Sequence, residues 1–228
     1  MRLVAVALLV ALVLGCGSAH ADGRHLHVLF VGNSLTAAND LPGTVAAIAR
    51  ARHVTIETRT FAPGGFALED HWAAGDALAV LRAGGWDAVL LQQGPSSLPE
   101  SRDNLIEWSK RWAYEARAHG TRPALFTVWP ETERSYVFAD VVRNYHDAAV
   151  AAGAGLFPAG LAWRFALVKG VKLYGPDGFH PSPLGSYLAA LVIYAGLTGE
   201  LPRVGGKLGS RTARVLRVAA SSALRTAR

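Results

Sequence analysis

The stretch HLHVLFVGNSLT, residues 25–36, joins a short β-rich apolar run to a serine that follows Gly32-Asn33. The run predicts a strand over 25–31 that stops at the glycine and asparagine. A serine at such a strand–helix junction can present its hydroxyl above the sheet, with its own backbone N–H directed at an anion. Ser34 could equally be the N-cap of the helix, which is the commoner role of serine at this position.

Downstream of this stretch, predicted strands and helices alternate. Further strands are predicted over 54–61, 87–92, 123–129 and 155–158, and helices over 41–52, 68–83, 102–119, 136–153, 161–168 and 183–197. Near-continuous apolar strands alternating with amphipathic helices indicate a parallel sheet that is covered on both faces. Ligands bind such sheets at the carboxyl ends of the strands. Ser34, Gly64-Gly65 and Gln93-Gly94 each follow a predicted strand.

A second stretch, DGFHP at 177–181, offers a carboxylate and an imidazole three residues apart in a loop rich in glycine and proline. A histidine beside a serine can take the hydroxyl proton and later return it to a leaving alcohol. A carboxylate fixes the tautomer of that histidine and stabilises the imidazolium. Asp177 and His180 could also form an ordinary Asx-turn before a helix. With Ser34 they supply the three side chains of a Ser-His-Asp hydrolase.

Over roughly residues 28–197 the chain resembles the SGNH hydrolases, the GDSL-type esterases and lipases. Gly32-Asn33-Ser34-Leu35 is similar to the first block of the family, Gly-Asp-Ser-Leu, and 177–180 matches the last block, Asp-x-x-His. The resemblance implies Ser34 as nucleophile, His180 as general base and acid, and Asp177 as the residue that orients His180. It also implies an α/β fold, a three-layer α/β/α sandwich of flavodoxin-like kind with a central parallel sheet.

The resemblance further implies an oxyanion hole. Gly64-Gly65 is similar to the second block, whose glycine donates a backbone N–H, and its position favours Gly65 beside the N–H of Ser34. The third block departs from the usual Gly-x-Asn-Asp, because QQGPS stands at 92–96, with Ser96 in the place of the asparagine. This stretch looks more like the Gln-Gly-Glu of some carbohydrate acetylesterases in the superfamily. A glutamine amide can donate to an oxyanion, so Gln93 is assigned, with Gln92 and Ser96 as alternatives; both glutamines could instead merely cap the strand.

The first 21 residues have the pattern of an export signal, with Arg2, an apolar run over 3–14 and then small residues. The sequence AHA at 19–21 has the form that ordinary signal peptidase cuts. The sequence VLGC ending at Cys16 resembles a bacterial lipobox, which would make the cysteine a lipidated N-terminus. The sequence therefore predicts an exported protein, periplasmic or extracellular, with membrane attachment only if Cys16 is lipidated.

Composition fits one domain over 25–200 with a large core, since 51% of the 228 residues are hydrophobic. The formal net charge is +6, but much of the positive charge lies in the segment 201–228, a basic C-terminal tail expected to be a frayed helix or disordered. The body is near neutral, so nucleic-acid binding is not expected. The single cysteine excludes an internal disulfide, and His25 and His27 on the first strand do not indicate a metal site without further ligands.

The sequence as a whole predicts a serine esterase that needs no metal or organic cofactor. Small acyl esters are the expected substrates, with an O-acetylated carbohydrate as the preferred class and a lipid ester as the alternative. Two other hypotheses remain: a catalytically silent carbohydrate- or envelope-binding module that uses the same cleft, and an acyltransferase. His71-Trp72 and Trp129-Pro130 are candidates to line the substrate pocket, although core or helix-face packing explains them as well.

Overall fold

The computed structural model describes residues 24–204 and 208–227, and the predicted export signal lies outside them. Within these residues, five strands form one parallel sheet in the order β2-β1-β3-β4-β5. Their bounds are β1 His25–Val31, β2 Thr55–Phe61, β3 Ala88–Leu91, β4 Arg122–Phe126 and β5 Gly155–Phe157. Each corresponds to a predicted strand. The central strands are buried on both faces, as the unbroken apolar runs indicated.

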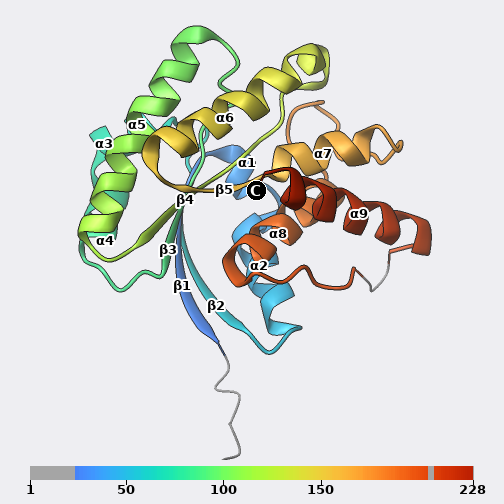
Figure 1. Cartoon of the computed structure of the whole chain (residues 1–228), viewed down its shortest axis with the longest axis horizontal. Coiled ribbons are helices and arrows are strands. Elements are labelled where there is room, and N and C mark those ends of the chain that lie inside the picture. The colour runs from blue at the N-terminus through green and yellow to red at the C-terminus, as the bar shows by residue number, and fades with distance from the viewer. Residues whose placement is uncertain (1–23, 205–207, 228) are drawn as a thin grey trace, which may run out of the picture.

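Helices cover both faces of the sheet, so the predicted three-layer α/β/α architecture is confirmed (Figure 1). Helices α3 to α6 lie on one side, and α2, α7, α8 and α9 on the other. The bounds are α1 Ser34–Ala37, α2 Leu41–Arg50, α3 Leu68–Ala74, α4 Asp76–Arg82, α5 Pro99–Ala118, α6 Phe138–Ala152, α7 Ala159–Leu167, α8 Pro183–Thr198 and α9 Ser210–Thr226, with 3-10 turns at Ala38–Asp40 and Thr132–Val137. Among the described residues, no helix combines the length and apolar character needed to cross a membrane.

The predicted helix over 68–83 is two helices. Gly75 ends α3 with a left-handed backbone (φ 84°), and α4 begins at the next residue. Glycine adopts this conformation without the steric cost of a Cβ, which is why helices so often end on it. Apolar spacing continues across the break because both helices pack on the same core, so periodicity alone did not reveal it.

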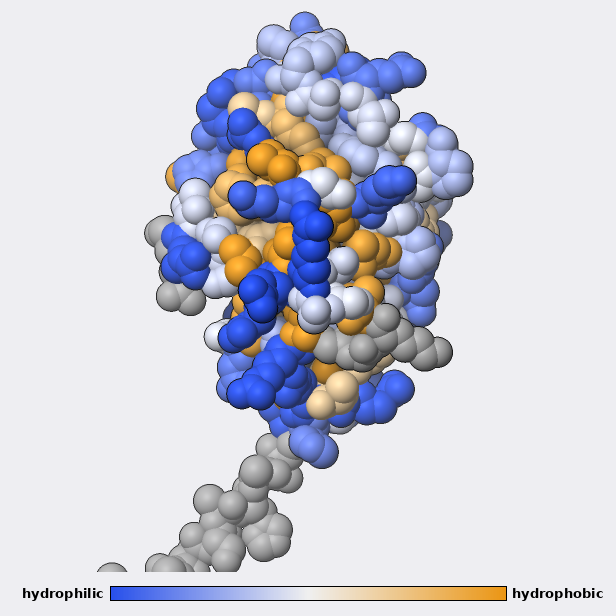
Figure 2. All heavy atoms as spheres, turned by 90° about the vertical axis from the view of Figure 1, so that its right-hand side faces the viewer, coloured by the Kyte–Doolittle hydropathy of each residue, from blue (hydrophilic) through white to orange (hydrophobic). Residues whose placement is uncertain are grey.

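The basic tail contains an ordered amphipathic helix rather than the expected frayed or disordered segment. Helix α9 buries Leu216, Ala219, Ala220 and Ala223 against α7 and α8, while its arginines at 211, 214, 217 and 225 are exposed. Figure 2 shows this face of the molecule, where apolar side chains lie among strongly hydrophilic ones. The apolar stripe is made mostly of alanines, which weakens its signal in the sequence.

Candidate active site

The three residues of the predicted triad meet above the carboxyl end of β1. The Ser34 Oγ lies 2.9 Å from Nε2 of His180, and the His180 Nδ1 lies 2.6 Å from Oδ2 of Asp177. A carboxylate only accepts hydrogen bonds, so Nδ1 carries the ring proton and Nε2 accepts from the serine hydroxyl. Ser34 does not cap the helix, because the side chain of Asn33 does so by accepting from the N–H of Leu35.

The loop 177–181, which carries Asp177 and His180, is fixed by hydrogen bonds within it and by an aromatic pair beneath it. Oδ1 of Asp177 accepts the backbone N–H groups of Phe179 and His180, at 3.0 and 2.9 Å. Together with the bond from the His180 ring, these hydrogen bonds lower the pKa of Asp177 to about 2. The bond from the ring has the largest effect, followed by the bond from the N–H of Phe179. Beneath the loop, the Trp129 indole donates to the carbonyl of Phe179 at 3.2 Å and stacks on Trp163. Trp129 is fully buried, so it supports the loop from below and does not line the pocket, as the core-packing alternative expected.

This lowered pKa gives a pH prediction for stability. The folded-state pKa of Asp177 is below the value near 3.9 of an unfolded carboxyl. The carboxylate therefore stabilises the fold above about pH 4, and this contribution is lost as the pH falls toward 2. We expect Asp177→Asn to have a lower Tm than the parent at pH 5–7, with a smaller difference at pH 3. Scanning calorimetry of both proteins at these pH values tests this; a difference that does not change with pH contradicts it.

Gln92 fixes the loop that carries the serine. Its Oε1 accepts the N–H of Asn33 at 3.0 Å and the hydroxyl of Thr36 at 2.7 Å. Its Nε2 donates to Oδ1 of Asn33 at 3.0 Å and to the carbonyl of Gln93 at 2.6 Å. Gln92 is fully buried, and all these partners are internal. It is thus occupied in joining the end of β3 to the end of β1, which leaves it no hydrogen to offer an oxyanion.

Two further features fix the same turn. A Cβ on Gly32 would collide with the Gln92 amide oxygen and with the Thr36 hydroxyl, so only glycine allows this close approach. Nε2 of His71 lies 2.7 Å from the carbonyl of Gly32 and therefore donates to it. Burial lowers the pKa of His71, which favours the neutral imidazole. His71 is thus a structural residue on the inner face of α3.

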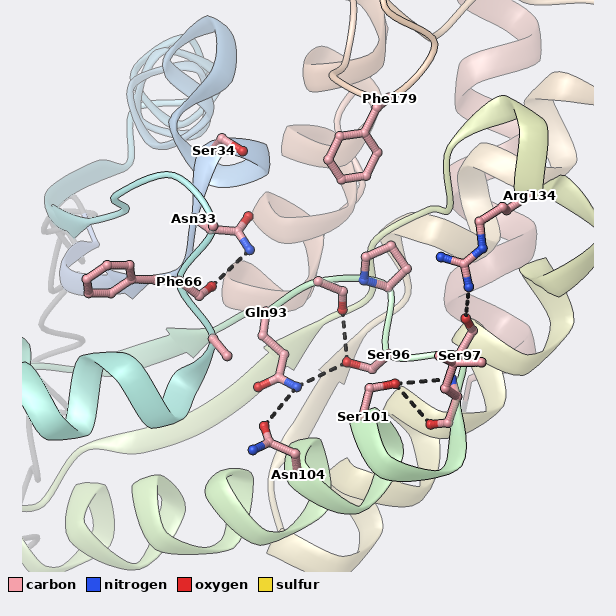
Figure 3. A pocket seen from close by; sticks show the side chains of 15 residues that line it. Asn33, Ser34, Phe66, Gln93, Ser96, Ser97, Ser101, Asn104, Arg134 and Phe179 are labelled. Carbon is pink, nitrogen blue, oxygen red and sulfur yellow. Dashed lines mark hydrogen bonds between the residues drawn. The ribbon is translucent and has the colours of Figure 1, made fainter.

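A pocket of about 550 Å³ opens beside Ser34, between the ends of β1, β2 and β3 (Figure 3). Gly65 lines it with a left-handed backbone (φ 79°), a conformation that favours glycine. Within the described residues, the backbone N–H groups of Ser34 and Gly65 donate no hydrogen bond. Two backbone N–H groups that have no partner in the described part of the chain therefore belong to residues that line the pocket.

Gln93 lines the same pocket, but its amide is engaged elsewhere. Its Nε2 donates to Oγ of Ser96 at 3.1 Å and to Oδ1 of Asn104 at a long 3.4 Å, while its Oε1 accepts the N–H of Leu68 at 3.2 Å. In Figure 3 the amide points toward Asn104 and away from Ser34. The hydroxyl of Ser96 donates to the carbonyl of Gly94. In this conformation, therefore, neither the amide of Gln93 nor the hydroxyl of Ser96 is directed at the hydroxyl of Ser34.

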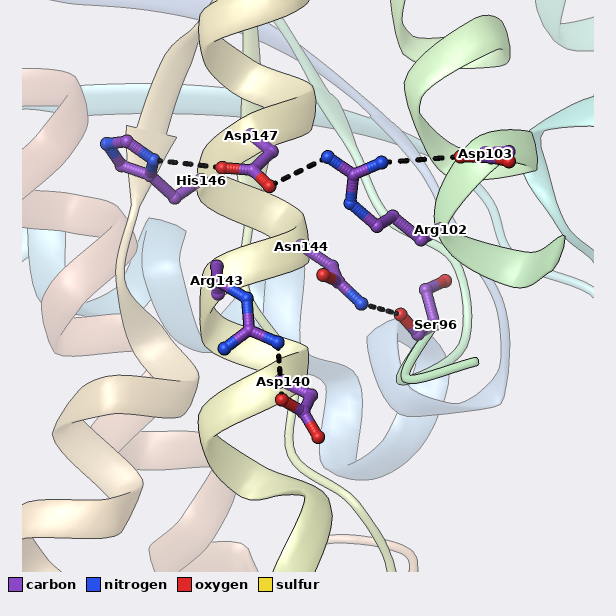
Figure 4. A network of polar contacts seen from close by, with 8 residues as sticks. All are labelled: Ser96, Arg102, Asp103, Asp140, Arg143, Asn144, His146 and Asp147. Atoms are coloured by element: carbon purple, nitrogen blue, oxygen red, sulfur yellow. Dashed lines mark hydrogen bonds and ion pairs between the residues drawn. The ribbon is translucent and has the colours of Figure 1, made fainter. Parts of the chain in front are cut away.

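Helix α6 supports the loop after β3 through two residues that the sequence did not single out. Asn144 donates from Nδ2 to the carbonyl of Ser96 at 2.8 Å (Figure 4). The neighbouring hydroxyl of Tyr145 bonds to both the N–H and the carbonyl of Gln93. Ser96 has a positive φ of 49°, a strained conformation for a non-glycine residue that these contacts hold in place. In the sequence, the only signal for these roles was the place of Asn144 and Tyr145 on an otherwise apolar face of the predicted helix.

No family model and no curated protein sequence matches the chain. Among solved structures, a candidate SGNH hydrolase from Slackia heliotrinireducens is 26% identical, with a TM-score of 0.65 over 76% of this chain and 100% of that one. A DUF4886 family protein from Bacteroides uniformis is 18% identical, with a TM-score of 0.72 over 89% of this chain and 95% of that one. A variant of an acetyl xylan esterase from Geobacillus stearothermophilus is 15% identical, with a TM-score of 0.61 over 79% and 98%.

The Slackia protein supports a hydrolase of the SGNH kind. At identities of 14–18% most of the other neighbours establish the fold alone. The Slackia protein adds sequence similarity over its whole length to the likeness in fold. The resemblance that the sequence blocks indicated is thereby confirmed: this chain is a member of the SGNH hydrolase (GDSL-type esterase/lipase) superfamily.

Proposed function

We propose that the chain is an exported serine esterase that removes small acyl groups, acetyl above all, from carbohydrate esters. One observation carries the proposal: the hydroxyl of Ser34 is hydrogen-bonded to a histidine that is itself oriented by a carboxylate, at the edge of an accessible pocket. This arrangement activates a serine for attack on an ester carbonyl. A binding module would have no need of it.

In the proposed reaction, Ser34 Oγ attacks the ester carbonyl while Nε2 of His180 takes its proton. The tetrahedral intermediate collapses, and the imidazolium returns that proton to the departing alcohol. Water then attacks the acyl-serine, with His180 again as the base, and the acid is released. Asp177 stays ionised throughout, because its low pKa keeps the charge that stabilises the imidazolium.

The proposed oxyanion hole uses the two backbone N–H groups of Ser34 and Gly65. Both border the pocket and have no partner among the described residues. Gln93 is the proposed third donor. Its 3.4 Å contact with Asn104 is the weakest of its hydrogen bonds, so that hydrogen is the one that substrate binding can redirect.

The lining of the pocket favours a carbohydrate ester. Apolar groups of Pro95, Leu98 and Phe179 lie near the polar side chains of Gln93 and Asn104. Sugars match such mixed surfaces, since their rings offer both C–H faces and hydroxyls. A sugar hydroxyl can exchange hydrogen bonds with these amides, whereas a long acyl chain offers them no donor or acceptor.

The proposed location outside the cytoplasm rests on the export pattern of the first 21 residues. Cleavage after Ala21 and lipidation of Cys16 remain alternative forms of this proposal. Mass spectrometry of the mature protein separates them, because lipidation adds acyl chains at Cys16 and cleavage begins the chain at Asp22.

The test of the proposed activity is hydrolysis of p-nitrophenyl acetate, butyrate and octanoate, together with acetylated xylan. We expect kcat/KM to fall as the acyl chain lengthens, and acetate to be released from the polysaccharide. A fluorophosphonate probe should add its mass to Ser34. Absence of both hydrolysis and labelling in the folded protein would favour the binding module. Ester formation on an added sugar, in preference to hydrolysis, would indicate the acyltransferase.

The third oxyanion donor gives a separate prediction. Removing one such donor costs about 10²–10³-fold in kcat, so we expect Gln93→Leu to lower kcat by that amount with little change in KM. The alternative, that Gln93 only fixes the loop between β3 and α5, predicts a lowered Tm with kcat nearly unchanged. Asn104→Ala is the matched control, since it removes the same hydrogen bond and leaves the amide in place. Steady-state kinetics and thermal melts of both variants decide between the two roles.

A further inference from the structure

Two histidines and a glutamate meet at the other end of the sheet, where β1 and β2 begin. Nε2 of His25 lies 3.0 Å from Oε1 of Glu57, and Nδ1 of His27 lies 3.6 Å from Oε2 of the same carboxylate. One ligand atom from each of the three residues falls within 4.8 Å of the others. The sequence offered only the two histidines; the parallel register, which pairs His27 with Glu57, adds the third group.

We propose that His25, His27 and Glu57 form a binding site for one divalent transition-metal ion of the zinc type. Zinc binds imidazole nitrogen and carboxylate oxygen at about 2.0–2.2 Å, so two ligands in a tetrahedral site lie ~3.4 Å apart. The distances from the two imidazole nitrogens to the nearer oxygen of the Glu57 carboxylate, Oε1 for His25 and Oε2 for His27, lie close to this value. Two imidazoles with one carboxylate suit zinc, copper or nickel better than magnesium or calcium, which take oxygen ligands.

The backbone sets up this arrangement before any metal binds. Residues two apart in a strand point to the same face, so His25 and His27 lie side by side, with their ring centroids 4.7 Å apart. The backbone of His27 is fixed on its other side by Asp87, the residue before β3, whose carboxylate accepts its N–H at 2.8 Å. Little main-chain movement is therefore needed to bring the three ligand atoms onto one ion.

The exposure of the three side chains suits entry of a metal from solution. Their exposed fractions are 47%, 45% and 60% for His25, His27 and Glu57. Three protein ligands leave a fourth position for water, which is the pattern of an open zinc site. No other group of three or more such side chains with this spacing occurs among the described residues.

The site is separate from the proposed active site. Ser34 follows the carboxyl end of β1, whereas His25 begins that strand, and seven residues span ~20 Å. The ion would join β1 to the edge strand β2 and would stabilise the fold through them, because it binds the folded arrangement in preference to the unfolded chain. It takes no part in ester hydrolysis, so the two proposals stand or fall independently.

The experiment is titration of the untagged protein with ZnCl₂, followed by calorimetry and thermal melts. We expect one zinc per chain and a Tm that rises by roughly 5 °C at zinc a hundred-fold above Kd and returns to its starting value with EDTA. His27→Ala and Glu57→Gln should each weaken binding at least ten-fold. Co²⁺ in place of zinc should give the visible absorption of a low-symmetry site in the parent and not in these variants, a readout that does not depend on stability.

The matched control is His119→Ala. His119 lies 3.4 Å from the largely buried Glu115, in a histidine–carboxylate pair without a second histidine, so this variant should bind zinc as the parent does. Binding only at millimolar zinc, or equal binding by the parent and both site variants, overturns the proposal. Loss of binding in His119→Ala that matches the loss in His27→Ala also overturns it, since the metal would then not be held at this cluster.

Discussion

Ser34→Ala and His180→Ala should each lower kcat for p-nitrophenyl acetate by about 10⁴- to 10⁶-fold, with KM nearly unchanged. Without the hydroxyl there is no nucleophile, and without the imidazole nothing takes the proton that lies on the 2.9 Å hydrogen bond between them. The serine and the histidine act as one catalytic unit, so removing either one already removes the rate enhancement that both provide. The double variant should therefore be hardly slower than either single one.

Ser97→Ala is the matched control for the nucleophile. Ser97 lines the same pocket, but its hydroxyl accepts a hydrogen bond from Arg134 at 2.9 Å and is not hydrogen-bonded to His180. Its loss should change kcat by less than about ten-fold, with kinetics measured at matched folded fraction. Rates that stay within ten-fold of the parent in Ser34→Ala would mean that the triad is idle, and the binding module would then be the better hypothesis.

The sequence was most informative where a residue's role depends on its place at the end of a strand. Apolar runs placed the ends of β1 and β3, and an alternating pattern broken by proline and glycine placed the end of β2. These ends carry Ser34, Gly65 and Gln93 to one pocket. That step needs only the rule that parallel strands end at the same edge. The spacing of Asp177 and His180 likewise allowed a local hydrogen bond to be expected within one loop.

Roles that depend on which way a side chain points were not accessible. Gln92 and Gln93 are adjacent at the end of β3, and successive residues there point to opposite sides. One amide therefore joins the serine loop, and the other reaches the pocket toward Asn104. No property of the pair QQ distinguishes them in the sequence. The sequence did not indicate Glu57 as a possible metal ligand for a related reason, because only the register of β1 and β2 brings it beside His27.

Composition was a weaker guide than position for the C-terminal segment. The arginines of α9 suggested a solvated tail, yet the helix packs its small residues on α7. Alanines bury little area one by one, so their contribution becomes visible only when the partner helix is known. The position of Asn144 on the apolar face of α6 was a signal in the sequence, but its partner, the carbonyl of Ser96, could be identified only in the structure.

Gln92→Leu should lower the free energy of unfolding by about 3–5 kcal/mol. The change leaves the N–H of Asn33 and the hydroxyl of Thr36 buried without a partner, and each such group costs about 1–3 kcal/mol. Because the same bonds fix the turn before Ser34, kcat should also fall in the fraction that remains folded. Urea unfolding and active-site titration measure the two effects separately.

Thr36→Val serves as the control for Gln92→Leu, since it removes one of the hydrogen bonds and retains the others. It should cost about 1–2 kcal/mol, and the double variant should cost less than the sum of the single ones, because the two groups share a bond. A loss below 1 kcal/mol in Gln92→Leu, with kcat reduced as for an oxyanion donor, would reverse the assignment of the two glutamines. Gln92 would then serve the reaction, and the serine loop would be held by its other hydrogen bonds, those from His71 to Gly32 and from Asn33 to Phe66 among them.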